Sequence, residues 1–136
     1  RESSSKKIVL NSKENKNKFD FQRSPELIYG LRNFIGNAVK FSNHNILISI
    51  ISDNINLFII IEDDGPGFPE DIIKALGEPY IKSRSKILKN NVGLGLGTFL
   101  GKTLLERQSA VIYFENDSSL NGAKVKIKWR INDLLI

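Results

Sequence analysis

Three groups of residues in this sequence have the types and spacing needed to bind a phosphorylated ligand. The first group contains two amides and an ammonium: Asn33, Asn37 and Lys40 are spaced at i, i+4 and i+7, so on a helix they lie along one face. An Asn carbonyl oxygen can coordinate Mg²⁺, and a Lys ammonium can neutralise a phosphate. Taken alone, the same pattern also fits a solvated helix edge.

The second group is the acidic turn EDDGPGF at residues 62–68, which follows an apolar segment. We expect its carboxylates at the end of a strand, where a break in the backbone can face a ligand. Asp63 only accepts hydrogen bonds when ionised, which suits an exocyclic amine such as that of adenine. Gly65 and Gly67 permit close backbone approach and positive φ. An ordinary Asp-Gly turn is the alternative interpretation of the same residues.

The third group is the glycine series Gly93, Gly95 and Gly97, which leads into an apolar stretch of helical period. Alternating glycines before a helix expose backbone N–H groups at the positive end of its dipole, where a phosphate can bind. We reject a dinucleotide fingerprint because G-x-G-x-x-G opens a helix directly after a strand, whereas a polar segment precedes this series. The sequence also lacks G-x-x-x-x-G-K-[ST], so it is not a P-loop protein.

The remaining pattern predicts the elements that must hold these groups in place. Ser24 as N-cap, Pro25 in the first turn and Glu26 at the positive end of the dipole begin a helix that runs to Phe41. Alternating and 3.6-residue apolar periods predict strands at residues 6–10, 18–21, 46–52, 56–62, 111–115 and 123–131, and further helices at 70–76 and 96–107. This order predicts an α/β (α+β) two-layer sandwich, with a mixed, largely antiparallel sheet and three helices on one face.

Composition limits the class of protein. The chain has 136 residues, 40% of them hydrophobic, so we expect a single domain over residues 1–136. No Cys is present, which excludes disulfides and thiolate chemistry, and because there is no Met we expect a domain of a longer protein. The net charge of +5 raises nucleic acid as a partner. The basic residues form no helical stripe with interleaved aromatics, so no direct nucleic-acid partner is expected.

The order and spacing of the three groups, from about Pro25 to Trp129, resemble the GHKL ATP-binding superfamily, which includes gyrase B, Hsp90, MutL and the sensor histidine kinases. LRNFIGNAVKF at residues 31–41 resembles the kinase N box, DDGPG at 63–67 the first glycine box and GLGLG at 93–97 the second. GEPYIKSRSK at 77–86 resembles the lid entry of histidine kinases. Together with GLGLGTFLGKTLLER at 93–107 it is most similar to the RegB/PrrB group of redox-linked sensor kinases. The resemblance implies a Bergerat-type fold with an ATP lid at residues 77–92, and ATP and Mg²⁺ as cofactors.

The resemblance also implies roles for individual residues. Asn37 would coordinate Mg²⁺, Asn33 would support it, and Lys40 would contact phosphate. Phe41 would pack beside the adenine, and Asp63 would accept a hydrogen bond from the adenine amine. The remaining implied positions shape the pocket, line the phosphates or reach the γ-phosphate when the lid closes: Gly65, Gly67, Arg84, Lys86, Gly93, Leu94, Gly95, Leu96 and Gly97.

One position separates kinases from ATPases in this superfamily. Gyrase-like members place a Glu four residues before the metal-binding Asn, where it activates a water, but here that position is Asn33. An amide is not a general base near neutral pH, so the site can hold Mg–ATP without an evident means of hydrolysing it. Phosphotransfer to another side chain needs such a site. The alternatives are a free-standing anti-sigma-type serine kinase and a module that binds nucleotide without catalysis.

His44 is the single histidine and lies between Asn43 and Asn45 at a predicted helix-to-strand turn, which favours a surface position. A histidine kinase phosphorylates a His followed by an acidic residue in a helical dimerisation domain, so we expect the phosphoacceptor to lie N-terminal to Arg1. The resemblance further implies a homodimeric full-length protein, a cognate response regulator, and a bacterial inner-membrane sensor of which this chain is a cytoplasmic domain.

Overall fold

The structure is a computed structural model that describes residues 6–13, 25–76 and 93–134. The strand predicted at residues 18–21 and the lid predicted at 77–92, with Arg84 and Lys86, lie outside the described residues. The elements are β1 (Lys7–Lys13), α1 (Pro25–Phe41), β2 (Asn45–Ser52), β3 (Asn56–Asp63), α2 (Glu70–Leu76), α4 (Gly93–Glu106), β4 (Val111–Glu115), β5 (Lys124–Arg130) and α5 (Ile131–Leu134).

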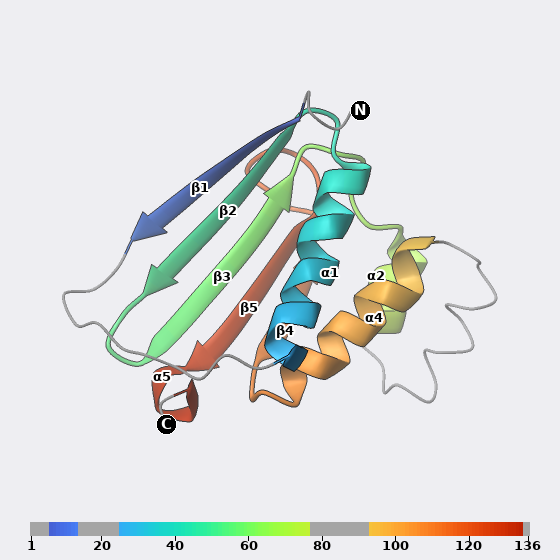
Figure 1. Ribbon diagram of the computed structural model, residues 1–136. Coiled ribbons are helices and arrows are strands. Elements are labelled where there is room, and N and C mark those ends of the chain that lie inside the picture. Colours follow the sequence, from blue (N-terminus) through green and yellow to red (C-terminus); the bar gives the residue numbers. More distant parts are fainter. Residues whose placement is uncertain (1–5, 14–24, 77–92, 135–136) are drawn as a thin grey trace.

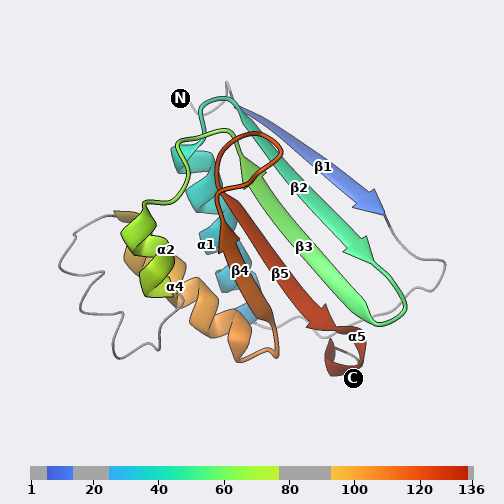
Figure 2. The same cartoon turned by 180° about the vertical axis from the view of Figure 1, so that it is seen from behind.

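The five strands form one sheet in the order β1-β2-β3-β5-β4. β1 and β2 run parallel, and the other three strand pairs are antiparallel. Helices α1, α2 and α4 lie together on one face of this sheet (Figure 1). The view from behind shows the opposite face, which no helix of the described residues covers (Figure 2). The predicted two-layer architecture and the mixed, largely antiparallel sheet are therefore confirmed.

The core lies between the sheet and α1. β5 shows the strand alternation that produces it, because Val125, Ile127 and Trp129 are buried while the lysines between them are only half-buried. From the helix side, Phe34 and Ala38 pack into the same cluster. Burying each large apolar side chain of this kind stabilises the fold by about 1.5–3 kcal/mol.

Helix α4 packs closely against α1 through glycines. A Cβ on Gly30 would lie 2.7 Å from Leu105 Cγ, and a Cβ on Gly101 would lie 3.3 Å from the Gly30 carbonyl oxygen. The sequence predicted that α4 would begin at Leu96, inside the glycine series. The structure begins the helix at Gly93 instead. The alternating glycines interrupt the apolar period that marks a helix, so the sequence does not show where this helix begins.

The C-terminal end also differs from the prediction. A strand was expected to include Ile131, but β5 ends at Arg130 and the chain turns into the short helix α5. The Ile131 backbone N–H donates to the Ile55 carbonyl oxygen at 2.8 Å, across the end of the β2–β3 hairpin. Ile131 also packs against the core, which holds the turn in place.

Candidate functional site

A cavity of about 210 Å³ lies between α1, the ends of β3 and β5, and the start of α4. Its described lining residues are Phe34, Asn37, Ala38, Phe41, Ile61, Asp63, Pro66, Gly67, Phe68, Pro69, Thr98, Ala123 and Val125. The walls are mainly apolar, and the polar side chains among these residues are Asn37, Asp63 and Thr98. A mainly apolar pocket with a few fixed polar groups suits a flat organic ligand whose orientation those groups select.

Helix α1 supplies one wall of the pocket because four of its residues share a face. Phe34, Asn37, Ala38 and Phe41 are spaced at i, i+3, i+4 and i+7, which stacks them on successive turns. Phe34 and Ala38 are buried, whereas Asn37 and Phe41 are half-buried at the edge of the cavity. The pocket is therefore a continuation of the apolar stripe that anchors this helix to the sheet.

Asp63 ends β3 and is 5% exposed. Its Oδ1 accepts hydrogen bonds from the backbone N–H groups of Gly65, at 2.9 Å, and Ala123, at 3.2 Å. Its Oδ2 accepts no hydrogen bond from the described residues. Burial raises the pKa of Asp63 above its ordinary value, although those two N–H groups oppose the shift. One oxygen thus fixes the carboxylate, and the other is left to accept a hydrogen bond from a ligand.

Asp64 binds the backbone of the turn between α1 and β2. Its carboxylate accepts the backbone N–H groups of Asn43, His44 and Asn45 at 2.8–3.1 Å, and the Asn45 side-chain amide at 3.2 Å. Burial opposes its ionisation, but these donors outweigh burial and lower the pKa of Asp64 to about 2. Asp64 fastens the α1–β2 turn and does not line the pocket.

The acidic turn requires glycine at two positions for different structural reasons. A Cβ on Gly65 would lie 2.3 Å from the Phe41 carbonyl oxygen, so only Gly allows the turn to approach the end of α1. Gly67 has a φ of 87°, a conformation that side chains rarely adopt. Gly67 lines the pocket, whereas Gly65 is packed behind it.

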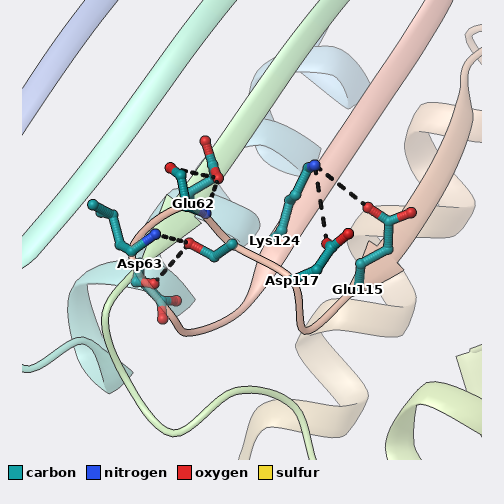
Figure 3. Close-up of polar contacts among 8 residues, drawn as sticks. Glu62, Asp63, Glu115, Asp117 and Lys124 are labelled. Atoms are coloured by element: carbon teal, nitrogen blue, oxygen red, sulfur yellow. Dashed lines mark hydrogen bonds and ion pairs between the residues drawn. The ribbon is translucent and has the colours of Figure 1, made fainter.

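The loop between β4 and β5 closes over the end of β3 (Figure 3). The Ser118 hydroxyl donates to the Asp63 carbonyl oxygen at 3.1 Å, and Glu62 accepts the Ser119 N–H at 2.8 Å. A Cβ on Gly122 would lie 2.4 Å from the same Asp63 carbonyl oxygen, so the turn needs Gly at that position. Through these contacts the loop supports the backbone that carries the pocket carboxylate.

Asn116, in the same loop, holds the wall formed by Phe68. Its Oδ1 accepts the Phe68 N–H at 2.7 Å, and its Nδ2 donates to the Phe68 carbonyl oxygen at 2.9 Å. The Phe68 ring packs edge-on against Phe114 at a centroid distance of 5.7 Å. This role was not predicted, because it depends on how the end of β4 lies beside residues 66–69.

Asn37 and Thr98 meet across the two helices at the pocket. Asn37 Nδ2 donates to Thr98 Oγ1 at 2.6 Å, and Asn37 Oδ1 accepts no hydrogen bond from the described residues. The described part of the chain contains no cluster of three His, Cys, Asp or Glu side chains able to hold a metal by itself. A lone amide carbonyl fits Mg²⁺ that takes most of its ligands from phosphate oxygens and water, as this ion commonly does.

The structure brings Asn37, Phe41, Asp63 and Gly67 together in the pocket lining. The predicted residues Asn33, Lys40, Gly65 and Gly97 are not among its described lining residues. Asn33 Nδ2 donates to the Tyr29 carbonyl oxygen at 2.9 Å, and the Asn33 side chain lies against Gly97 and Gly101 of α4. Lys40 is exposed, with Nζ 5.3 Å from the centre of the Phe41 ring. The first turn of α4 contains the four residues Gly93, Leu94, Gly95 and Leu96.

Sequence reasoning missed Thr98 as well as Asn116. A signal for Thr98 was present, since it is a polar residue directly after the glycine series in a largely apolar part of the helix, residues 94–100. Thr98 is fully buried, and its only described side-chain partner is Asn37.

Comparison with known proteins identifies the class. The family model of histidine kinase-, DNA gyrase B- and HSP90-like ATPases matches residues 23–133, so this chain belongs to that family. Sensor histidine kinase RegB of Cereibacter sphaeroides is 36% identical over 129 residues, which cover 84% of this chain and 28% of that protein. Sensor histidine kinase CssS of Bacillus subtilis is 32% identical over 89 residues, covering 65% of this chain and 18% of that protein.

The chain therefore spans less than a third of the length of these curated relatives. The solved structure of the Acinetobacter baumannii histidine kinase AdeS shares the fold, with a TM-score of 0.66 and 20% identity over 96% of this chain and 57% of that one. The resemblance to sensor histidine kinases, and to RegB among them, is confirmed. The names of these relatives favour a histidine kinase over an anti-sigma-type serine kinase. No helix in the described ranges is both long and apolar enough to cross a bilayer.

Proposed function

We propose that this chain is the catalytic ATP-binding domain of a two-component sensor histidine kinase. It binds Mg–ATP and donates the γ-phosphoryl group to a His of a separate dimerisation domain, from which the group passes to a response regulator. The observation that carries this proposal is the apolar pocket in which Asp63 Oδ2 and Asn37 Oδ1 have no partner among the described residues.

In this proposal, the two oxygens without a described partner bind the two ends of the ligand. Asp63 Oδ2 accepts a hydrogen bond from the adenine amine, and Phe41 and Phe68 pack beside the base. Asn37 lies toward α4, whose first turn at residues 93–96 offers backbone N–H groups to the phosphates. When bound, Mg²⁺ would neutralise phosphate charge, and Asn37 Oδ1 is the protein oxygen that would coordinate the ion.

Three further residues act on the phosphates in this proposal. Lys40 contributes charge from the end of α1, and Arg84 and Lys86 act from the lid, outside the described residues. Asn33 supports Asn37 from one turn earlier in α1. Each of these roles rests on the motif resemblance and on charge.

Water attack is disfavoured because Asp63 is the only carboxylate among the described lining residues, and it lies at the adenine end. His44 is exposed in the turn that Asp64 fastens. We therefore place the phosphoacceptor His in another part of the full-length protein, with residues 1–136 as one domain. The resemblance to sensor histidine kinases implies a homodimeric bacterial inner-membrane protein with this domain in the cytoplasm, and the proposal includes no direct nucleic-acid partner.

The test is to incubate the chain with γ-labelled ATP and Mg²⁺, with and without the dimerisation domain of the full-length protein. We expect no label on the chain alone and label on the added domain, as a phosphoramidate that is labile in acid and stable in base. A His44→Gln variant should transfer equally well. Label on His44, or multiple-turnover hydrolysis as fast as that of a dedicated ATPase, would overturn the proposal.

A further inference from the structure

Thr98 is a buried polar residue whose hydroxyl has one described partner, the side-chain amide of Asn37. It is 0% exposed and follows Gly97 in α4, while Asn37 belongs to α1. Leaving a buried hydroxyl without a hydrogen bond costs about 1–3 kcal/mol, so this contact is not incidental to packing. This hydrogen bond is 2.6 Å long and joins two helices that are far apart in the sequence.

The contact decides which end of the Asn37 amide faces the pocket. An Asn amide is planar and has a donor end and an acceptor end. Because Nδ2 donates to Thr98 Oγ1, the carbonyl Oδ1 is directed away from Thr98 and has no partner among the described residues. A rotated amide would present N–H groups, which repel a cation.

We propose that Thr98 is a positioning residue that holds the Asn37 amide so that Oδ1 is the atom offered to Mg²⁺. The inference rests on the proposed function, in which Asn37 holds that ion beside the phosphates. Outer-shell partners of metal ligands act in this way, and removing one commonly weakens metal binding by about 10–100-fold. A residue that only filled the α1–α4 contact would have no such effect on the ion.

The test separates shape from hydrogen bonding with two variants. Thr98→Val keeps the size and the branched shape but removes the acceptor, and Thr98→Ser keeps the hydroxyl but removes the methyl group. For each protein, calorimetry gives the Kd of ADP in EDTA and in saturating Mg²⁺, and the ratio of the two values is the Mg²⁺ enhancement.

We expect Thr98→Val to lower the Mg²⁺ enhancement about tenfold, with the Kd in EDTA changed less than about twofold. Thr98→Ser should keep the wild-type enhancement. In an Asn37→Ala background, Thr98→Val should change the enhancement no further, because the amide that it positions is gone. Thr98→Val with the wild-type enhancement, or with equal weakening in EDTA and Mg²⁺, would overturn the inference while leaving the proposed function intact.

Wild-type protein that binds ADP equally well with and without Mg²⁺ would instead overturn the proposed metal role, and the inference with it. A measurement on the wild type covers the case in which Thr98→Val does not fold. The Asn37 side-chain amide protons, observed by NMR without ligand, should exchange slowly with solvent if Nδ2 donates to the buried hydroxyl. Fast exchange at a level typical of exposed Asn side chains would refute the contact on which the inference stands.

Discussion

Asp63 and Asp64 are adjacent in the chain, yet they belong to two regions with opposite electrostatics. Asp63 faces the pocket, where burial raises its pKa and one oxygen remains without a described partner. Asp64 faces the α1–β2 turn, where three backbone N–H groups use both of its oxygens and hold its pKa at about 2. A carboxylate is available to a ligand only when the fold has not already used its acceptor capacity.

The largest expected effect is on nucleotide affinity. In Asp63→Asn, Oδ1 can still accept the Gly65 and Ala123 N–H groups, but an NH₂ group then meets the adenine amine. Loss of a charged hydrogen bond of about 1.5–3 kcal/mol predicts ADP binding weaker by about 10–100-fold. The matched control is Asp64→Asn, which should change the Kd in calorimetry less than about threefold. Equal losses in the two variants would remove the distinction between the regions.

The next effect is on the free energy of unfolding, where we expect Asp64 to matter more than Asp63. Asp64→Ala removes the acceptor of three backbone N–H groups, so it should lower the free energy of unfolding by about 2 kcal/mol in urea titrations. Asp53→Ala is a useful control, because Asp53 accepts only the Ile55 and Asn56 N–H groups in an exposed hairpin. A larger loss for Asp53→Ala than for Asp64→Ala would contradict the structural role of Asp64.

The pH dependence sharpens the comparison because the two shifts have opposite signs. The folded pKa of Asp64 lies below its ordinary value of 3.8, so its stabilisation is complete above that value and is lost as pH falls toward about 2. Because Asp64 is partly exposed, we expect the stability difference between wild type and Asp64→Asn to shrink by about 1 kcal/mol over this window.

The pKa of Asp63 is raised, so its ionisation costs stability as pH rises above 3.8. Asp63→Asn should therefore gain stability relative to wild type as pH increases, which is the opposite trend. Urea titrations of both variants across the acidic range measure both slopes. Slopes of the same sign would show that one of the two carboxylates is placed in the wrong environment.

The smallest effect tests whether the pocket side depends on the loop that supports it. Asn116→Asp keeps an acceptor for the Phe68 N–H but loses the donor to the Phe68 carbonyl oxygen. A neutral hydrogen bond is worth about 0.5–1.5 kcal/mol, so ADP affinity should fall about threefold. Asn116→Ala should weaken it further, and Asp117→Ala in the same loop should leave it unchanged. Wild-type affinity in Asn116→Ala would show that this loop does not shape the base end.

The sequence was sufficient for much of the fold. The N-cap, proline and apolar period defined α1 to the residue, and strand alternation located the central strands within a residue. The start of α4 was wrong, because the helix begins at Gly93 and not at Leu96. The alternating glycines interrupt the apolar period from which the sequence locates a helix, and glycine has a low intrinsic helix propensity.

The site was less predictable, and Asn33 shows why. Asn33, Asn37 and Lys40 share a helix face, but the pocket opens beneath α1 toward the sheet, on the face that carries Phe34, Ala38 and Phe41. Asn37 lies where the two faces meet, while Asn33 is turned toward α4. Which of two adjacent Asp residues enters the pocket also follows from the β2–β3 register, which pairs Ile46 with Asp63 on the helix-covered face.

The spacing of the α1 pocket residues restricts how this chain can change during evolution. Each residue in a helix turns the next by about 100°, so one residue inserted or deleted between Phe34 and Phe41 would rotate half of the pocket wall away from the cavity. A substitution in this segment changes one pocket residue at a time, whereas an insertion or deletion displaces several of them together. The Asp53–Asn56 turn lies at the opposite end of β3 from Asp63, so it can change length without moving the pocket. Length variation among descendants of this sequence should therefore accumulate at that turn and be absent from the second half of α1.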